Sequence, residues 1–222
     1  MIKSHIPKIL ITAGPTREFI DALRFISNPS TGRIGYLIAE NACKRGYEVI
    51  LLSGPTSLLP PKNVKIVYFE SALDLKEKVD KYFLWANWII FSSAVGDFRP
   101  VRKLKNKIKK SQGAPALKLV KNPDILKELG SKKADKILVG FALETNRLIE
   151  NARLKLEQKK LDLIVANQLS EHNFPFGNGK LSAALISENR VEKFEQIKKI
   201  QLASIILDRI EHLCYNLNNI EE

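Results

Sequence analysis

The sequence predicts an α/β protein with a mostly parallel sheet and helices on both faces. Six short runs rich in apolar and β-branched residues are typical of buried strands, and several gaps between them show helical periodicity. Strands that alternate with helices in this way are joined by right-handed crossovers. Such crossovers place helices on the sheet, so the strands run parallel and both faces are covered.

The expected elements follow one another in a Rossmann-like order. The first helix has an apolar stripe of Ile34, Leu37, Ile38 and Ala42 and stops at Gly46. Beyond residue 167 the pattern changes to a Gly-, Asn- and Pro-rich loop, "SEHNFPFGNGK", two short strand-like pieces and a final helix. We therefore expect one domain over residues 1–222, with a small C-terminal elaboration at 167–195. The expected strands are 8–13, 48–53, 64–69, 88–92, 136–141 and 161–166, and the expected helices are 33–45, 72–84, 145–160 and 196–217.

Composition and charge narrow the class of function. Lys and Arg number 36 against 24 Asp and Glu, which gives a net charge of +12. Such a charge attracts nucleic acid, anionic lipid or small polyanions, or simply favours solubility.

The longest nearly apolar stretch, residues 82–91, is too short to span a bilayer, and residues 1–7 show no signal region. Cys43 and Cys214 suggest reduced thiols, and the three histidines are too scattered for a zinc site or a catalytic triad. We expect a cytoplasmic protein with no membrane partner.

The usual phosphate-binding loops do not fit the glycines. Gly14 follows the first strand, but Gly32 comes too late for a compact Gly-x-Gly-x-x-Gly turn, and the second strand ends "LLSGP" without an acidic residue for a ribose. No Tyr is followed four residues later by Lys, and Gly179-Lys180 lacks the rest of a Walker loop. A nicotinamide-dependent dehydrogenase is therefore disfavoured.

The stretch "RFISNPSTGRIG" nevertheless ends on the start of a helix. Ser30, Thr31 and Gly32 lead directly into it, and the unpaired N–H groups of a helix start favour an anion. The alternative is that Ser30 or Thr31 caps the helix while Gly32 allows a turn.

Two further segments are basic. The loop after the fourth expected strand is lysine-rich, and because no aromatic residue follows Phe98 it makes a poor surface for base stacking. It is either a solvated loop or a segment that closes over phosphates. Lys155 and Lys159 lie one turn apart on a helix with no acid beside them, which is unfavourable unless an anion binds. The lysines of the loop are Lys103, Lys105, Lys107, Lys109 and Lys110.

Seven motifs in unbroken order carry a family resemblance. They are "ILITAGPTREFIDALRFISNPSTGRIG", "GYEVILLSGPTSL", "SSAVGDFRP", "KIKK", "LVKNPDIL", "VGFALETN" and "KKLDLIVAN". Over residues 8–167, and more weakly to the final helix, the chain resembles phosphopantothenate–cysteine ligase (phosphopantothenoylcysteine synthetase), the ligase half of the bacterial bifunctional coenzyme A biosynthesis protein. Gly96 and Leu143 replace alanines usual in the family, and "FGNGKLSAALI" departs from its usual acidic and Asn residues.

The resemblance implies activation of 4′-phosphopantothenate by CTP to an acyl-cytidylate, and then coupling to cysteine. It implies a Mg²⁺ ion on the triphosphate, although no metal ligands can be assigned, and a homodimer with residues 167–195 in a capping or dimerisation role. The flavin-dependent decarboxylase half usual in bacteria does not precede the ligase motifs, so we expect a free-standing ligase or an excised domain, with a separate phosphopantothenoylcysteine decarboxylase as partner. Nucleic acid is not an expected partner.

The family's site residues are carried over position by position. Asn28 and Lys107 are the expected catalytic residues, Asn28 for handling the acyl-cytidylate and Lys107 for reaching the phosphates. The expected nucleotide contacts are Phe91, Ser92, Ser93, Asp97, Lys107, Pro123, Asp124, Ile125, Leu126, Phe141, Lys155 and Lys159. The expected phosphopantothenate contacts are Asn28, Ser30, Thr31, Gly32 and Ala94.

Two other functions stay open at this point. A basic α/β protein that binds nucleic acid would explain the charge, and would show a salt-sensitive shift of DNA or RNA. A regulatory protein that binds nucleotide without catalysis would explain the motifs, and would bind CTP without releasing pyrophosphate.

Overall fold

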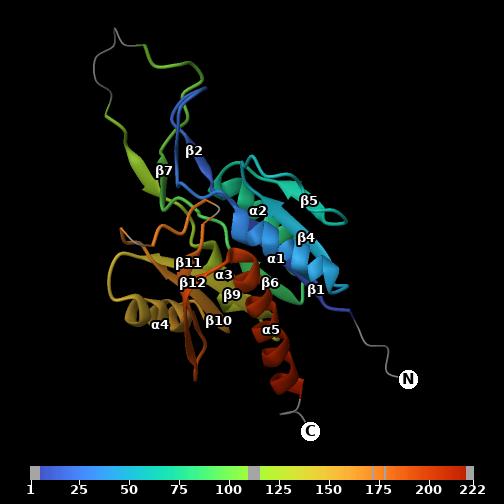
Figure 1. Cartoon of the computed structure of the whole chain (residues 1–222). Helices are drawn as coiled ribbons and strands as arrows, with labels where there is room; N and C mark the ends of the chain where they lie inside the picture. The colour runs from blue at the N-terminus through green and yellow to red at the C-terminus, as the bar shows by residue number, and fades with distance from the viewer. Residues whose placement is uncertain (1–5, 110–115, 172, 178, 219–222) are drawn as a thin grey trace.

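An eight-stranded sheet forms the centre of the molecule. The computed structural model describes residues 6–109, 116–171, 173–177 and 179–218. The strand order is β12-β11-β10-β9-β6-β1-β4-β5 (Figure 1). The six strands from β10 to β5 pair in parallel, whereas β11 and β12 are antiparallel, so the expected α/β class is confirmed. The strands are β1 (Lys8–Ala13), β4 (Glu48–Ser53), β5 (Lys65–Tyr68), β6 (Trp88–Phe91), β9 (Ile137–Glu144), β10 (Leu163–Gln168), β11 (Leu181–Ile186) and β12 (Val191–Ile197).

Helices cover both faces of this sheet. Successive side chains of a strand point to opposite faces. Ile9 and Ile11 of β1 accordingly pack with α1 and α5, whereas Leu10 packs in the core that α2, α3 and α4 close. The helices are α1 (Arg33–Lys44), α2 (Ala72–Phe83), α3 (Ile125–Lys132), α4 (Leu148–Gln158) and α5 (Lys199–Asn218).

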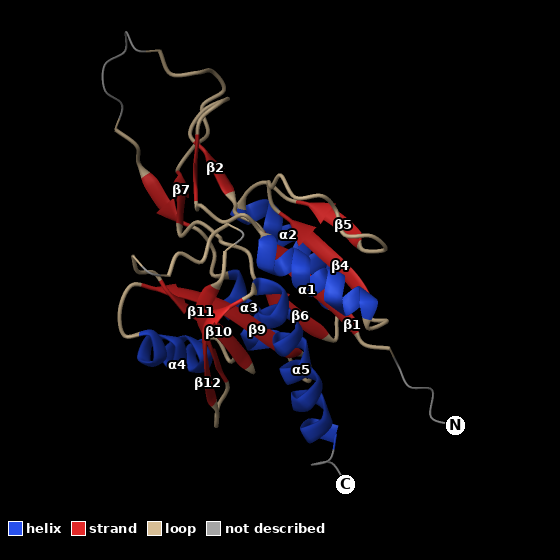
Figure 2. Ribbon diagram, in the orientation of Figure 1, coloured by secondary structure: helices blue, strands red, loops and turns tan. Residues whose placement is uncertain are grey.

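Four short strands outside the sheet form an arm. β2 (Arg17–Phe19) pairs with β3 (Phe25–Ser27), and β7 (Phe98–Pro100) pairs with β8 (Leu119–Lys121). These two ribbons project from the body of the molecule (Figure 2). We call β2, β3, β7 and β8, with the described segments that join them, the arm. The sequence pattern did not predict it.

Several boundaries differ from expectation for local reasons. The helix expected over 145–160 begins only at Leu148, because Arg147 has a left-handed φ of 44°. β9 continues to Glu144 instead of ending at residue 141. The final helix starts at Lys199, after Gln196 with a φ of 48°. Within the described ranges, no helix combines the length and the apolar character needed to cross a bilayer.

Candidate active site at the carboxyl ends of the strands

The crossover connections go to opposite sides of β1, which makes a topological switch point in the sheet. The chain passes from β1 through α1 to β4 on one side of β1, whereas β6 pairs with β1 on its other side. In open α/β sheets ligands bind beyond the carboxyl ends of the strands at such a switch point. The loops that follow β1 and β6 are therefore the first place to look for a site.

A cavity of about 480 Å³ lies there. It is lined by the end of β6 and the loop after it, the segment that enters α3, Phe141 of β9, and Lys159 just after α4. Nine of the twelve expected nucleotide contacts are among its lining residues. They are Phe91, Ser93, Asp97, Pro123, Asp124, Ile125, Leu126, Phe141 and Lys159.

The two serines that follow β6 contact different parts of the molecule. Ser92 donates its hydroxyl to the carbonyl of Thr12 at 2.5 Å and lies against α1, so it does not line the cavity. Ser93 lines the cavity, and its buried hydroxyl has no hydrogen-bond partner within the described part of the chain. Since buried hydroxyls are normally paired, Ser93 Oγ is a group that a ligand can satisfy.

The start of α3 forms one wall. Asp124 caps this helix by accepting from the N–H of Lys127 at 3.1 Å. It also accepts from Lys159 Nζ at 2.9 Å. Gly130 lets α3 approach the chain after α4, because a Cβ there would lie 1.8 Å from the carbonyl oxygen of Lys159. The position of Lys159 at the cavity is thus set by this close approach and by its ion pair.

The expectation that the two helix lysines lack acidic partners is wrong. Lys155 pairs with Glu144 at 2.6 Å, and Lys159 pairs with Asp124 at 2.9 Å. Both carboxylates come from other elements, so helix spacing could not reveal them. Lys155 does not line the cavity, and Lys159 lies just beyond the last residue of α4.

The loop that enters α1 excludes the alternative in which Ser30 or Thr31 caps the helix. The N-cap residue is Gly32, with a φ of 75° and no side-chain cap, so neither Ser30 nor Thr31 caps the helix. Instead, Ser30 Oγ accepts from the N–H of Gly32 at 3.3 Å. The first turn contains no acidic residue. A helix start of this kind can receive an anion on its N–H groups.

Asn28 connects this loop to the loop after β6. Its Nδ2 donates to the carbonyls of Ala94 and Val95 at 3.3 and 3.2 Å. Ala94 in turn donates to Gly14 O at 3.0 Å and accepts from the N–H of Thr16 at 3.3 Å. The expected phosphopantothenate residues and the cavity therefore lie on connected loops, although Asn28, Ser30, Thr31, Gly32 and Ala94 do not line the cavity.

Lys107 lies apart from these residues, on the arm. Its side chain is exposed, and it is not among the residues that line the cavity. Lys110, the last lysine of "KIKK", lies outside the described residues. The structure thus gathers nine of the expected nucleotide residues around the cavity, holds Asn28 on a loop bonded to Ala94 and Val95, and leaves Lys107 on the projecting segment.

Sequence reasoning missed five residues of the cavity wall. Among them, Asn122 donates from Nδ2 to Gly96 O at 2.7 Å and accepts from Arg99 at 3.1 Å, which joins the α3 entry to the loop after β6. The signal was available, since Lys121 and Asn122 stand inside "LVKNPDIL". The five residues are Val95, Gly96, Phe98, Lys121 and Asn122.

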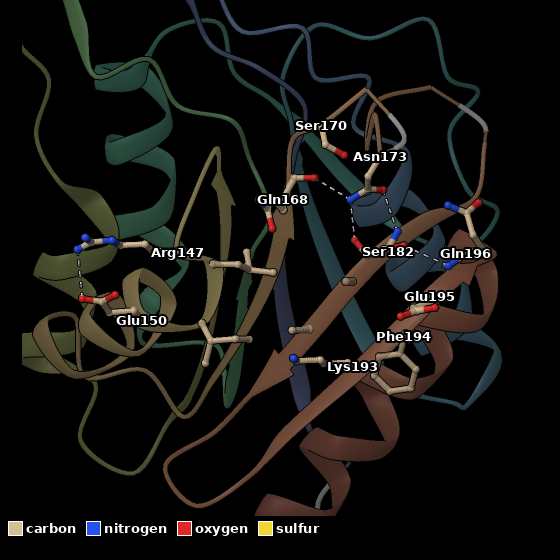
Figure 3. A pocket seen from close by; sticks show the side chains of 14 residues that line it. Arg147, Glu150, Gln168, Ser170, Asn173, Ser182, Lys193, Phe194, Glu195 and Gln196 are labelled. Atoms are coloured by element: carbon tan, nitrogen blue, oxygen red, sulfur yellow. Dashed lines mark hydrogen bonds and ion pairs between the residues drawn. The ribbon is translucent and has the colours of Figure 1, made fainter.

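A larger hollow of about 730 Å³ lies elsewhere, between the first turn of α4 and strands β10 to β12 (Figure 3). Asn173 joins several of its polar groups. Asn173 donates to the carbonyls of Gln168 and Ser182 at 2.8 and 3.0 Å, and accepts from the N–H of Ser182 at 2.8 Å. None of the expected site residues lines it.

No ready-made metal centre accompanies the cavity. Across the described ranges, there is no group of three or more His, Cys, Asp or Glu residues that could hold a metal ion. Two acidic residues, Asp97 and Asp124, line the cavity, and the carboxylate of Asp124 already bonds to Lys127 N–H and to Lys159. This donor set suits a Mg²⁺ ion that is held largely by substrate phosphates and water.

Comparison with known proteins decides the family. The model of the DNA/pantothenate metabolism flavoprotein C-terminal domain matches residues 5–213. The chain belongs to this family. The resemblance to the ligase half of the bifunctional coenzyme A biosynthesis proteins is thereby confirmed.

Individual family members agree with that placement. The coenzyme A biosynthesis bifunctional protein CoaBC of Bacillus subtilis (strain 168) is 41% identical over 207 residues, 92% of this chain and 51% of that protein. The crystal structure of the C-terminal domain of CoaBC superposes with a TM-score of 0.81 at 37% identity, covering 95% and 96% of the two chains. A Streptococcus pneumoniae DNA/pantothenate metabolism flavoprotein gives 0.82 at 27% identity, covering 93% and 99%. The chain spans about half the length of the curated relatives it matches.

Proposed function

We propose that this chain is a phosphopantothenate–cysteine ligase that uses CTP. The observation that carries the proposal is the cavity beyond β6 and β9. It collects nine residues, from separate segments of the chain, that the family resemblance assigns to the nucleotide. A volume of about 480 Å³ lies within the range of small-molecule sites. Family membership over residues 5–213 supports the same activity.

The proposed reaction has two balanced steps. A carboxylate oxygen of 4′-phosphopantothenate attacks the α-phosphorus of CTP, and the bond to the pyrophosphate oxygen breaks. The amine nitrogen of cysteine then attacks the acyl carbon of the acyl-cytidylate, and the bond from that carbon to the phosphate oxygen breaks. The products are 4′-phosphopantothenoylcysteine, CMP and pyrophosphate, and the amine loses a proton to solvent. Activation is needed because a free carboxylate would have to expel oxide.

The nucleotide would occupy the cavity. Phe91 and Phe141 offer apolar surface beside the base or ribose, and Ser93 Oγ offers an unsatisfied hydrogen-bonding group. Asp97 lines the same cavity and is the carboxylate nearest in sequence to the serines. Catalysis would then rest on positioning and on electrostatic stabilisation of the leaving pyrophosphate.

Phosphopantothenate would enter from the α1 side. Its phosphate would meet the N–H groups at the start of α1, where Gly32 leaves the helix without a side-chain cap. Asn28 links this loop to the carbonyls of Ala94 and Val95, which directly precede the cavity residues Gly96 and Asp97. The acyl group would therefore be delivered beside the loop that follows β6.

A bound Mg²⁺ would neutralise charge on the triphosphate, with Asp97 as the carboxylate of the cavity wall that caps no helix, since Asp124 caps α3 and pairs with Lys159. The ligase would act as one cytoplasmic domain, with residues 167–195 as its elaboration. Its product would pass to a phosphopantothenoylcysteine decarboxylase, carried on a separate chain or elsewhere on the same one.

A homodimer would explain the position of Lys107. The arm exposes apolar side chains that include Phe25 (39% exposed) and Phe98 (48% exposed). A second copy packed on this surface would bury them, and would bring the exposed lysines of the arm to a neighbouring molecule. Light scattering on the chain and on the Phe25→Ser, Phe98→Ser double variant tests this, because the variant should be monomeric.

The deciding experiment supplies phosphopantothenate, cysteine, Mg²⁺ and each nucleoside triphosphate in turn. Pyrophosphate and product masses are measured. We expect CTP to give the fastest turnover, and equal or faster turnover with ATP would refute the nucleotide assignment. Absence of pyrophosphate release with every nucleotide would refute the ligase proposal.

A matched pair of lysine variants tests the cavity itself. Lys159 lines it, whereas Lys44 lies on α1 in a surface pair with Glu40. Each change to Gln removes one positive charge from the molecule. Lys159→Gln should raise the KM for CTP about tenfold, the size expected for one charge-assisted contact, and Lys44→Gln should leave it unchanged. Equal effects of the two variants would mean that only the overall field matters.

A further inference from the structure

Asp21 is a buried carboxylate of the arm, outside the proposed cavity. It lies between β2 and β3, with its side chain fully buried. Its Oδ1 accepts from the N–H groups of Leu23 and Arg24 at 2.9 and 2.8 Å. Its Oδ2 accepts from Arg24 Nε at 2.9 Å and from the N–H of Ile108 at 3.1 Å. One oxygen therefore fixes the turn, and the other reaches a residue 87 positions later.

Asp21 and Arg24 together hold both polar ends of Ile108. Asp21 accepts from its N–H, and Arg24 Nη2 donates to its carbonyl at 2.7 Å. Arg24 Nη2 also pairs with Asp21 Oδ2 at 2.7 Å, so the two side chains act as one unit. We call this arrangement the Asp21–Arg24 clamp. A bond to an ionised partner is stronger than one between neutral groups, so the clamp is a firm attachment point.

The clamped segment lies along the β2–β3 ribbon. Leu104 donates its N–H to Ile20 O at 3.0 Å, and the Lys103 ammonium lies 4.2 Å from the centre of the Phe19 ring. Leu104 and Ile108 are half-buried, whereas Lys105 and Lys107 are exposed. The ribbon thus holds the backbone at Leu104 and Ile108, and the exposed Lys107 extends from a backbone that is fixed at the next residue.

We propose that Asp21 is a positioning residue, which acts through Arg24 and Ile108 to hold Lys107 where it can meet the triphosphate. This rests on the proposed function, in which Lys107 reaches the phosphates. Fixing the backbone beside Lys107 means that less conformational freedom is lost when the lysine engages its anion. A lysine on an untethered loop would have to be ordered at each turnover.

The charge state of Asp21 fits this role. The N–H groups of Arg24 and Leu23 hold the pKa of its carboxyl well below the usual range, and the N–H of Ile108 acts in the same direction, while burial opposes them. The carboxylate therefore stays ionised near neutral pH, and the clamp is present whenever the enzyme would work.

The Asp21→Asn variant breaks the bonds of the clamp and keeps the bonds of the turn. The carboxamide keeps the size of the side chain, and its oxygen can still accept from Leu23 and Arg24. Its NH₂ group would face the donors of Ile108 and Arg24, so those bonds are lost. We expect pyrophosphate release in a single turnover to slow about tenfold, measured at a temperature where the variant is folded, because the unpaired buried donors will also lower its melting temperature. Asp162→Asn is the matched control, since Asp162 also accepts a backbone N–H, that of Leu138, and pairs with Lys133, but lies far from the arm along the sheet.

A double variant decides whether Asp21 acts through the lysine. If it does, adding Asp21→Asn to Lys107→Gln should slow the reaction less than about twofold further, because residues that act as a unit are not additive. Two full, additive losses would overturn the proposal and make Asp21 a residue of the turn alone.

A second readout does not depend on catalysis. The N–H of Ile108 belongs to the peptide bond that trypsin would cleave after Lys107, and the clamp holds that bond on the ribbon. Asp21→Asn should speed cleavage after Lys107 about tenfold, measured by mass spectrometry of the fragments, whereas Asp162→Asn should not. Unchanged cleavage would overturn the clamp. If even the unaltered protein releases no pyrophosphate, the proposed function fails, and the cleavage rates still decide the clamp.

Discussion

Gly35 allows α1 to lie directly on the strand ends. A Cβ at this position would lie 2.5 Å from Ser92 Oγ, 2.6 Å from Ala13 Cβ and 3.2 Å from Thr12 O. Ordinary contacts of this kind are about 3.4–4 Å, so in Gly35→Ala the start of α1 would have to rise by about 1 Å. The helix start that the proposal assigns to the phosphate would move with it.

Two costs follow from that displacement. Overpacking costs about 1–3 kcal/mol. Because alanine has a better helix propensity than glycine, the substitution also stabilises the helix by up to about 1 kcal/mol, which partly offsets that cost. A net loss of about 1–2 kcal/mol should lower the melting temperature by about 2–8 °C for a chain of this size. A displacement of about 1 Å at a binding group can cost about a hundredfold, so the KM for phosphopantothenate should rise between about ten- and a hundredfold.

Gly46, after the other end of α1, gives the matched control. Its φ is 86°, and nothing lies within 4 Å of a Cβ built there. Gly46→Ala should therefore cost about 1–2 kcal/mol through backbone strain alone. Calorimetry and steady-state kinetics on both variants separate stability from binding. A normal KM in Gly35→Ala, or an equally raised KM in Gly46→Ala, would refute the assignment of the α1 start to the phosphate.

Three further variants test other parts of the molecule. Lys107→Gln should cost about 2–4 kcal/mol in the first half-reaction with little change in folding, and pyrophosphate release at the unaltered rate would reduce Lys107 to a solvated lysine. Asn28→Asp replaces a donor to two carbonyls by a carboxylate, and should let acyl-cytidylate build up while product lags; equal loss of both steps would contradict this. Glu192→Gln breaks the bidentate pair with Arg209, and should lower stability at pH 7 by about 1.5 kcal/mol in chemical denaturation. Arg209 lowers the pKa of Glu192, so the difference in unfolding free energy between the two proteins should be present above pH about 4.3. It should vanish as the pH falls through the lowered pKa. A difference that persists in strong acid would exclude the ion pair as its cause.

The sheet was predictable from the sequence because its strands are buried on both faces. Runs such as Ile9–Ala13 are apolar except for Thr12, which is what a parallel strand between two helical layers favours. The strands of the arm have three residues each, for example Phe98–Pro100, and that is too short for an alternating pattern to be visible. α3 was missed for a different reason. Its cap, Asp124, stands in the motif "LVKNPDIL", which the family resemblance assigns to nucleotide contacts and which shows no helical periodicity of its own.

The sequence predicted only those residues of the candidate site that stand in family motifs. Nine of the expected nucleotide residues line one cavity, because the end of β6, β9, the entry to α3 and the residue after α4 meet there. The partners of Lys155 and Lys159 were not predictable, since Glu144 and Asp124 approach them through tertiary packing. The choice between a hydroxyl cap and an uncapped start of α1 could not be made from the sequence, because it depends on the left-handed conformation of Gly32.

The end of β6 explains how two substrates could meet without sharing a pocket. Just beyond β6, Ser92 bonds to Thr12 and lies against α1, whereas Ser93 lines the cavity. Phosphopantothenate on the α1 side and nucleotide in the cavity would thus approach the same short loop from opposite faces. Asn28 holds that loop by two carbonyls, so it controls the separation of the two sides. Its effect on catalysis would then follow from the geometry of the loop, even if its carboxamide never touches the acyl-cytidylate.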